Sequence, residues 1–298
     1  MTEQFAQIRP DVELCYETFG DPADPTVLLV MGLATQMIAW DADFCEMLVE
    51  RGFHVVRFDN RDVGRSTRVN GAPPSLVQIA LRSRDGASYS LSDLAGDATR
   101  LLDHLGVERA HVVGASMGGM IAQTIAIEHP ERLLSLCSIM SNVGARLSGQ
   151  PALAIYPLML RRAPKDRDGY VEHVVRLYGE IGSKGFAVDE ERLRRQGALA
   201  HERGVSAAGN ARQMAAILTA SDRTKALAGV RVPTLVIHGT ADRLVRPSGG
   251  KATAKAIPGA QLLLIDGMGH DLPRDAWVQI VDAIAANAQR AGEPLATA

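Results

Sequence analysis

The sequence predicts an α/β fold: a three-layer sandwich whose mostly parallel sheet lies between helices, with a helical cap inserted between two strands. Three observations predict it. Short apolar runs that end in polar or glycine residues alternate with helix-like segments along most of the chain. These runs are continuously apolar, which is typical of parallel strands covered on both faces. The alternation stops between about Asn142 and Ala228, where only helical patterns remain.

The apolar runs are the predicted strands of the sheet. One stretch, residues 12–20, alternates apolar and polar residues, which predicts an antiparallel strand at the sheet edge. The continuous runs predict parallel strands at residues 26–32, 54–60, 110–116, 133–141, 234–240 and 261–266.

Amphipathic segments between these runs predict helices at residues 41–52, 90–106 and 275–289. In the second of them, Ser90 followed by Asp93 resembles a capping box, and Gly106 is the predicted C-terminal end of the helix.

Residues 1–141 and 229–298 are the predicted core, and residues 142–228, called here the helical insertion, are the predicted cap. The insertion carries the mixed-charge clusters "RRAPKDRD" and "DEERLRR". We interpret both as solvated helix faces rather than as a partner site.

Composition excludes several classes of protein. Of the 298 residues, 46% are hydrophobic and 22% charged, as in soluble globular proteins, and a net charge of −2 gives no basic field for nucleic acid or a membrane surface. Neither a signal peptide nor a membrane span is evident, so we expect a cytoplasmic protein. The three cysteines are widely spaced, which favours buried free thiols over a disulfide framework. No metal or cofactor is expected, and the chain could be a monomer or a homodimer.

The stretch "VVGASMGGM" at residues 112–120 sets Ser116 between Gly114 and Gly118, after a predicted strand and before an apolar helix. A G-x-S-x-G motif in that context is typical of a nucleophile elbow, in which tight packing requires glycine on both sides. The alternative is a glycine-rich crossing whose serine only caps the helix.

A serine nucleophile needs a base, and the base needs an orienting acid. Asp242 follows the strand at 234–240, and His270 lies in a Gly-rich loop after the strand at 261–266. Because parallel strands end at one edge of the sheet, we expect all three side chains to meet there. His238 lies at a strand end and is predicted to be structural, and Asp271 is too close in sequence to orient His270.

The run of elements resembles the α/β-hydrolase superfamily over nearly the whole chain. Within it, the segments "GDPADPTVLLVMGL" and "RFDNRDVGRST" and the nucleophile segment are similar to aclacinomycin methylesterase and related bacterial carboxylesterases. The D-x-R-D-x-G-x-S pattern of that branch is present at Asp59, Arg61, Asp62, Gly64 and Ser66.

The resemblance implies an oxyanion hole made of two backbone N–H groups, those of Met117 and Leu33. This chain has Met31-Gly32 before Leu33, where many relatives have His-Gly. Arg61 and Asp62 are interpreted as members of an ion pair that fixes the loop beside the site.

A hydrophobic pocket could be walled by Trp40 and by the apolar stretch of the insertion that contains Tyr156 and Met159. The same spacing fits ordinary packing of a helix on the sheet, so both interpretations stay open.

The residues favour a serine carboxylesterase without cofactor, which acts on a small-molecule ester through an acyl-enzyme. A lactonase, a C–C bond hydrolase or a cofactor-free perhydrolase could use the same three residues. A ligand sensor without turnover is the alternative from another class.

Overall fold

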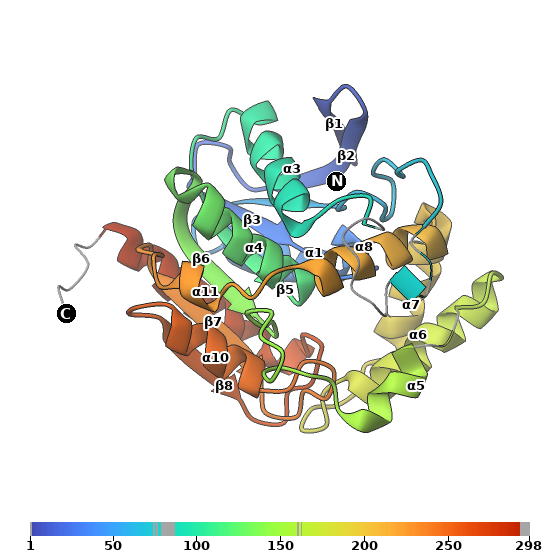
Figure 1. Ribbon diagram of the computed structural model, residues 1–298. Helices are drawn as coiled ribbons and strands as arrows, with labels where there is room; N and C mark the ends of the chain where they lie inside the picture. The colour runs from blue at the N-terminus through green and yellow to red at the C-terminus, as the bar shows by residue number, and fades with distance from the viewer. Residues whose placement is uncertain are drawn as a thin grey trace.

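The computed structural model describes residues 2–73, 75, 77–78, 87–159, 161 and 163–292. Its centre is an eight-stranded sheet with helices on both faces (Figure 1). This arrangement confirms the predicted three-layer α/β fold.

The sheet has the strand order β1-β2-β4-β3-β5-β6-β7-β8. Strands β1 and β2 run antiparallel to their neighbours, and all the other pairs are parallel. The strands are β1 (Gln4–Arg9), β2 (Val12–Phe19), β3 (Thr26–Val30), β4 (His54–Phe58), β5 (Ala110–Ala115), β6 (Leu133–Ile139), β7 (Thr234–Gly239) and β8 (Gln261–Ile265).

The six predicted parallel strands are present as β3 to β8, and the predicted antiparallel strand is β2. The prediction that this antiparallel strand forms the edge was wrong, because β1 pairs outside it. In β1 only Ala6 is buried, and Phe5 is 46% exposed. An edge strand that lies mostly in solvent gives a weak apolar pattern, although the Pro10-Asp11 pair after it is a turn signal.

Alternate residues of each central strand enter two separate hydrophobic layers. Leu28 and Val30 of β3 pack in the layer that contains α3 (Leu91–His104) and α4 (Met117–Glu128). Val27 and Leu29 pack in the opposite layer, with α1 (Ala42–Val49) and α11 (Trp277–Gln289). Helix α10 (Ser248–Ala256) packs against β7 and β8, and short 3-10 turns lie at η1 (Met37–Ala39), η3 (Pro130–Arg132), η5 (Arg274–Ala276) and η6 (Arg290–Gly292).

Helix α3 begins and ends where its sequence predicts. Ser90 and Asp93 form a reciprocal capping box at its start. Gly106 has a φ of 69°, the left-handed conformation that commonly ends a helix.

The described residues between β6 and β7 form helices and loops and contain no strand, as predicted for the helical insertion. Helices α5 to α8 lie together on the right of Figure 1, beside the sheet. The helical elements are η4 (Leu153–Ile155), α5 (Tyr156–Met159), α6 (Arg167–Ile181), α7 (Glu190–Arg203), α8 (Ala207–Thr219) and α9 (Thr224–Leu227).

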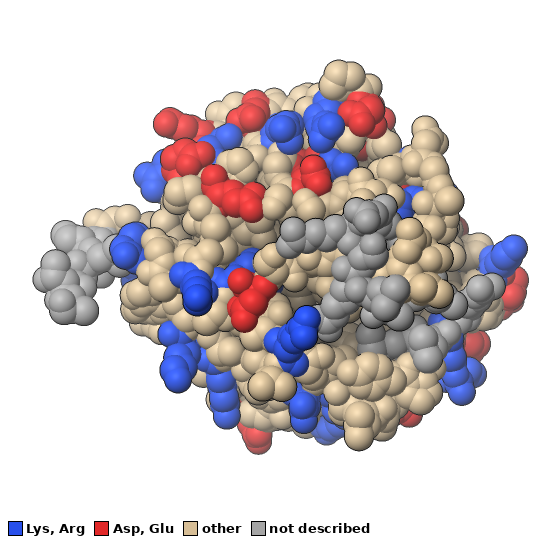
Figure 2. Space-filling view, viewed as in Figure 1, with Lys and Arg blue, Asp and Glu red and all other residues tan. Residues whose placement is uncertain are grey.

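Figure 2 shows acidic and basic side chains on the same face of the molecule. The cysteines Cys15, Cys45 and Cys137 are buried free thiols. Among the described residues, no helix combines the length and the apolar character needed to cross a membrane.

Candidate active site

Ser116 lies in the turn between β5 and α4, with backbone angles of φ 57° and ψ −119°. A non-glycine residue rarely adopts a positive φ, so the turn is strained and needs support from its surroundings. The Ser116 N–H donates to the Ile139 carbonyl at 2.9 Å, and the Ser141 hydroxyl donates to the Ser116 carbonyl at 2.8 Å. Both supports come from β6 and the loop after it, and they hold the turn from one side.

Two glycines flank this turn at points of backbone contact. A Cβ atom on Gly114 would lie 2.1 Å from the Gly118 carbonyl oxygen, and a Cβ atom on Gly118 would lie 2.0 Å from the Val30 carbonyl oxygen. Real Cβ atoms do not approach backbone so closely, and these carbonyl groups belong to rigid elements. The turn therefore exists in this form only with glycine at both positions.

Ser116, His270 and Asp242 form one continuous chain of hydrogen bonds. The Ser116 Oγ lies 2.9 Å from His270 Nε2, and His270 Nδ1 lies 2.8 Å from Asp242 Oδ2. The three residues follow β5, β8 and β7, so the carboxyl edge of the parallel strands brings them together from distant parts of the sequence. An arrangement of this kind can remove a proton from the hydroxyl and return it to a leaving group.

Asp242 is ionised in a buried position. Burial alone would raise its pKa, but the facing His270 ring and His238 lower the pKa of Asp242 to about 2. Its second oxygen accepts the backbone N–H groups of Leu244 and Val245, both at 2.9 Å. The carboxylate is thus charged at neutral pH and fixed in orientation.

His238 lies in β7 and is fully buried behind Asp242. Its Nε2 is 2.7 Å from the Val245 carbonyl oxygen and 3.5 Å from Asp242 Oδ2. The predicted structural role fits these contacts, which support the loop that carries the acid.

The loop that carries His270 is held by the helical insertion. The His270 N–H donates to the Ile181 carbonyl at 2.8 Å, and the Gly269 N–H donates to the Ser183 hydroxyl at 3.0 Å. That hydroxyl donates in turn to Asp271, 2.5 Å away. Asp271 therefore fixes the loop and does not bond the imidazole. Sequence reasoning missed Ser183, because nothing near residue 183 marks it as a neighbour of residue 269.

The two residues expected to form an oxyanion hole belong to two different segments of the chain. Met117 is the first residue of α4, and Leu33 lies in the loop after β3. Within the described part of the chain, neither backbone N–H donates to a protein acceptor. A Cβ atom on Gly32 would lie 3.0 Å from the Ser116 Cβ and 3.5 Å from its hydroxyl, so the Leu33 loop approaches the serine closely.

The D-x-R-D-x-G-x-S segment is a framework of buried hydrogen bonds. The interpretation of Arg61 and Asp62 as ion-pair residues holds, but each pairs with a distant partner. Arg61 forms two bonds of 2.5 Å with Asp97 of α3, and Asp62 accepts two bonds of 2.8 Å from Arg212 of α8. Burial opposes ionisation of Asp62, yet hydrogen bonds from Arg212 and Tyr89 hold its pKa below the usual value.

The other residues of the motif fix the same loop. A Cβ atom on Gly64 would lie 2.1 Å from Asp59 Oδ2, and the Ser66 hydroxyl donates to the Asp59 carbonyl at 2.6 Å. Asp59 accepts the Met37 N–H at 2.7 Å and pairs with Arg203 of α7. The motif therefore connects the core to the insertion. Among the described residues, none of its hydrogen bonds reaches the Ser116 hydroxyl.

The predicted pocket residues lie in different surroundings. Trp40 is fully buried beside Phe44, with ring centroids 5.5 Å apart, and its Nε1 has no partner among the described residues. Tyr156 begins α5 and is 43% exposed. Met159 ends α5, and its side chain lies outside the described part of the structure. Their role as a pocket wall stays a prediction.

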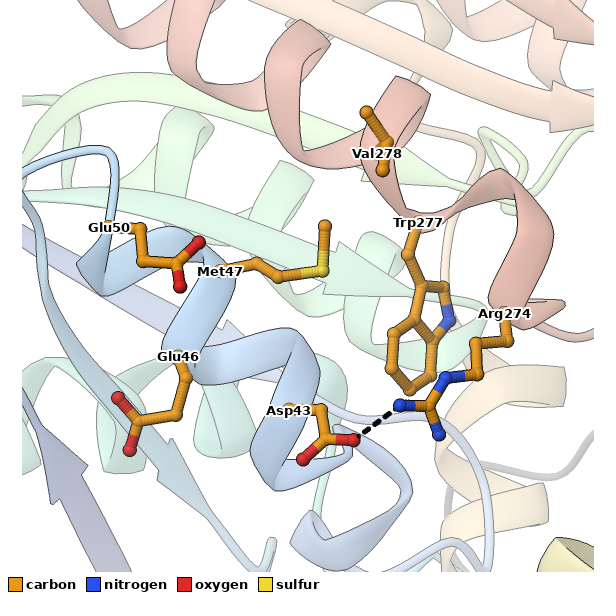
Figure 3. Close-up of a pocket in the computed structure, with 7 residues that line it drawn as sticks. All are labelled: Asp43, Glu46, Met47, Glu50, Arg274, Trp277 and Val278. Carbon is orange, nitrogen blue, oxygen red and sulfur yellow. Dashed lines mark hydrogen bonds and ion pairs between the residues drawn. The ribbon is translucent and has the colours of Figure 1, made fainter.

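A surface hollow of about 400 Å³ lies between α1 and the η5–α11 segment (Figure 3). Arg274 and Asp43 form an ion pair of 2.6 Å at one end, next to the Trp277 ring. None of Ser116, Asp242 and His270 lines this hollow, so we assign it no part in the chemistry.

The sequence matches the model of a known family over residues 25–274, described as the alpha/beta hydrolase fold. Two similar proteins are rhodomycin D methylesterases. DnrP of Streptomyces peucetius is 30% identical, covering 94% of this chain and 96% of its own. DauP of Streptomyces sp. (strain C5) is 31% identical, covering 95% and 97%.

A solved structure of a hydrolase from Pseudomonas aeruginosa PA01 has a similar fold. It is 25% identical and covers 98% of both chains with a TM-score of 0.70. The family match spans most of the chain, and both methylesterases align over nearly their full lengths. This chain belongs to the alpha/beta hydrolase family.

Proposed function

We propose that the protein is a serine carboxylesterase, with Ser116 as nucleophile, His270 as general base and acid, and Asp242 as the orienting acid. The observation that carries the proposal is the continuous hydrogen-bonded line from the Ser116 hydroxyl to the Asp242 carboxylate, with its two links of 2.9 and 2.8 Å. Family membership and the two methylesterases support a carboxylic ester hydrolase.

In the first half of the reaction, Ser116 Oγ attacks the ester carbonyl carbon while His270 Nε2 takes the hydroxyl proton. The carbonyl π electrons move to oxygen, and the N–H groups of Leu33 and Met117 stabilise that negative charge. Each such donor typically lowers the barrier by about 3 to 4 kcal/mol. When the tetrahedral intermediate collapses, the alkoxide leaves with the proton from His270, and the acyl group stays on Ser116.

In the second half, His270 Nε2 removes a proton from water, and the oxygen of that water attacks the acyl carbon. The second intermediate collapses, Ser116 recovers its proton from His270, and the carboxylic acid is released. Asp242 stays ionised throughout, because the lowered pKa of about 2 opposes its protonation. It keeps the Nδ1–H tautomer, which leaves Nε2 free to accept the hydroxyl proton.

The proposed substrate is a methyl or other short-chain ester of a hydrophobic compound. The two relatives named as rhodomycin D methylesterases support a methyl ester. We propose that the helical insertion serves as a cap over the ester, and that Trp40, Tyr156 and Met159 contact its acyl part.

The test is a comparison of hydrolysis rates on p-nitrophenyl esters of increasing chain length and on small methyl esters. The wild-type enzyme should hydrolyse them, and Ser116→Ala should lower kcat by about 10⁶-fold or to the background rate. Activity in Ser116→Ala within tenfold of the wild-type rate would overturn the proposal.

A second measurement separates an esterase from a protein that only binds ligand. An organophosphonate should add one mass increment to the intact protein, and Ser116→Ala should stay unlabelled. A wild-type protein that resists labelling and hydrolyses no ester would favour the sensor. A lactone included in the same panel tests the lactonase alternative, because a lactone hydrolysed much faster than every open-chain ester would reassign the bond.

A further inference from the structure

We infer that Gln213, on α8 of the helical insertion, is a positioning residue for the oxyanion hole. This inference rests on the proposed function, in which the Leu33 N–H stabilises the oxyanion. Leu33 lies in the loop of residues 31–36, which connects β3 to η1.

Gln213 connects the insertion to two loops of the core through one buried amide. Its Oε1 accepts the Ala34 N–H at 2.9 Å, and its Nε2 donates to the Arg61 carbonyl at 3.0 Å. The side chain is fully buried. Because one partner is a donor and the other an acceptor, only one orientation of the amide satisfies both.

The hydrogen bond to the Ala34 N–H lies one residue after the Gly32–Leu33 peptide, which carries the proposed Leu33 donor. The Asn60 Nδ2 donates to the Met31 carbonyl at 2.9 Å, so the loop is anchored on the core side one residue before Gly32. Gln213 anchors it again at the Ala34 N–H. The peptide between Gly32 and Leu33, which carries the proposed donor, lies between these two anchors.

The local backbone needs such an anchor. Ala34 has a φ of 58°, in the left-handed region that non-glycine residues avoid. A strained residue keeps this conformation only when its surroundings enforce it. Without the Gln213 bond, Ala34 can relax toward a negative φ, and that rotation turns the Leu33–Ala34 peptide and moves the Leu33 N–H that precedes it.

Gln213 is itself held in place by its neighbour on α8. Arg212 forms the two bonds of 2.8 Å with Asp62, one residue after the carbonyl that Gln213 binds. This ion pair holds α8 against the Arg61–Asp62 loop, so the position of the Gln213 side chain is fixed. We expect it to set the direction of the Leu33 N–H without contacting substrate.

The test compares Gln213→Met, which keeps the length of the side chain and removes both bonds, with Gln213→Glu, which keeps an acceptor for the Ala34 N–H. Misplacement of a catalytic group by about 1 Å costs on the order of 100-fold in rate. We expect Gln213→Met to lower kcat by about 10- to 100-fold with KM changed less than threefold. We expect Gln213→Glu to recover part of that loss.

The decisive readout is the ratio of kcat/KM for an ester to that for its thionoester, in which sulfur replaces the carbonyl oxygen. Sulfur is larger and accepts hydrogen bonds weakly, so a well-formed oxyanion hole favours the oxygen ester. The ratio should fall in Gln213→Met by about the same factor as kcat. A purely structural role would slow both substrates equally and leave the ratio unchanged.

The matched control is Gln196→Met on α7, the same substitution on a half-buried glutamine of the insertion. Gln196 bonds Asp41 at 3.5 Å, and among its described bonds none reaches the Leu33 loop. We expect its ester-to-thionoester ratio to stay within twofold of the wild-type value. If Gln213→Met does not fold, Gln213→Asn replaces it, because that amide is one methylene too short to reach Ala34.

If a folded Gln213→Met or Gln213→Asn protein keeps the wild-type ester-to-thionoester ratio and its activity still requires Ser116, the inference about Gln213 is wrong. That result would leave the proposed function intact. Failure of the proposed function is a different result, since it appears as an active Ser116→Ala protein.

Discussion

Replacement of Asp242 by asparagine tests the electrostatic part of the mechanism. The change removes one charge and alters the shape of the side chain very little. One carboxylate oxygen accepts the Leu244 and Val245 N–H groups, both at 2.9 Å, so the oxygen of the new amide will take that position. The NH₂ group then faces His270 Nδ1, which must become an acceptor. The ring proton moves to Nε2, and the ring can no longer accept the Ser116 proton.

The size of the expected loss in kcat follows from the free-energy cost of the flipped amide orientation. Turning the amide over would leave one buried and one half-buried N–H donor without acceptors, at about 1 to 3 kcal/mol each. The productive orientation is therefore disfavoured by about 2 to 6 kcal/mol, and the charge that stabilises the imidazolium is lost as well. We expect Asp242→Asn to lower kcat by about 10⁴-fold, which corresponds to about 5 kcal/mol in the barrier.

The assay is kcat on a p-nitrophenyl ester, with circular dichroism as the check of folding. The control is Asp266→Asn, because Asp266 is an exposed aspartate that bonds Thr240 at 2.8 Å, four residues before His270. Its kcat should stay within threefold of the wild type. A loss below tenfold in a folded Asp242→Asn protein would refute the reasoning and assign the acid role elsewhere.

Three further predictions concern the framework of the site. Gly118→Ala should lower kcat at least about 100-fold and lower the Tm, because its Cβ would lie 2.0 Å from the Val30 carbonyl oxygen; kinetics and thermal melts measure both. Arg212→Met should reduce the free energy of unfolding by about 3 to 5 kcal/mol, because it leaves the buried Asp62 carboxylate without its cation. The double variant with Asp62→Asn should recover part of this lost stability, as measured by urea titration. Folding lowers the pKa of Asp242 from 3.8 to about 2, so its ionised form contributes about 2 kcal/mol to the free energy of unfolding above pH 4. This contribution is lost as the pH falls toward 2. The urea midpoints of the wild type and of Asp242→Asn should therefore converge over that range.

Sequence reasoning predicted most of the sheet, because buried parallel strands have a local apolar signature. The elbow was predicted for a related reason, since the strain at Ser116 demands glycine at fixed neighbouring positions. Strand β1 was missed because most of its side chains face solvent and leave no apolar pattern.

The contacts between the insertion and the core could not be predicted from local patterns. Asp62 and Arg212 are 150 residues apart, and Ala34 and Gln213 are 179 residues apart. Nothing beside Arg212 in the sequence distinguishes it from an arginine on a solvated helix face. Only the folded arrangement of α8 over the core loops identifies its partner.

The helical insertion bonds three of the loops that carry the proposed chemistry. The His270 N–H donates to the Ile181 carbonyl, the Ala152 N–H donates to the Arg243 carbonyl beside Asp242, and Gln213 accepts the Ala34 N–H in the loop of Leu33. An exchange of this segment with that of another family member would therefore transplant more than selectivity. A chimaera that lacks these three attachment points would inherit the donor's preference for a substrate together with a disordered reaction centre. Engineering of new specificity in this scaffold should therefore change surface residues of the helical insertion and keep the residues of its three attachment points.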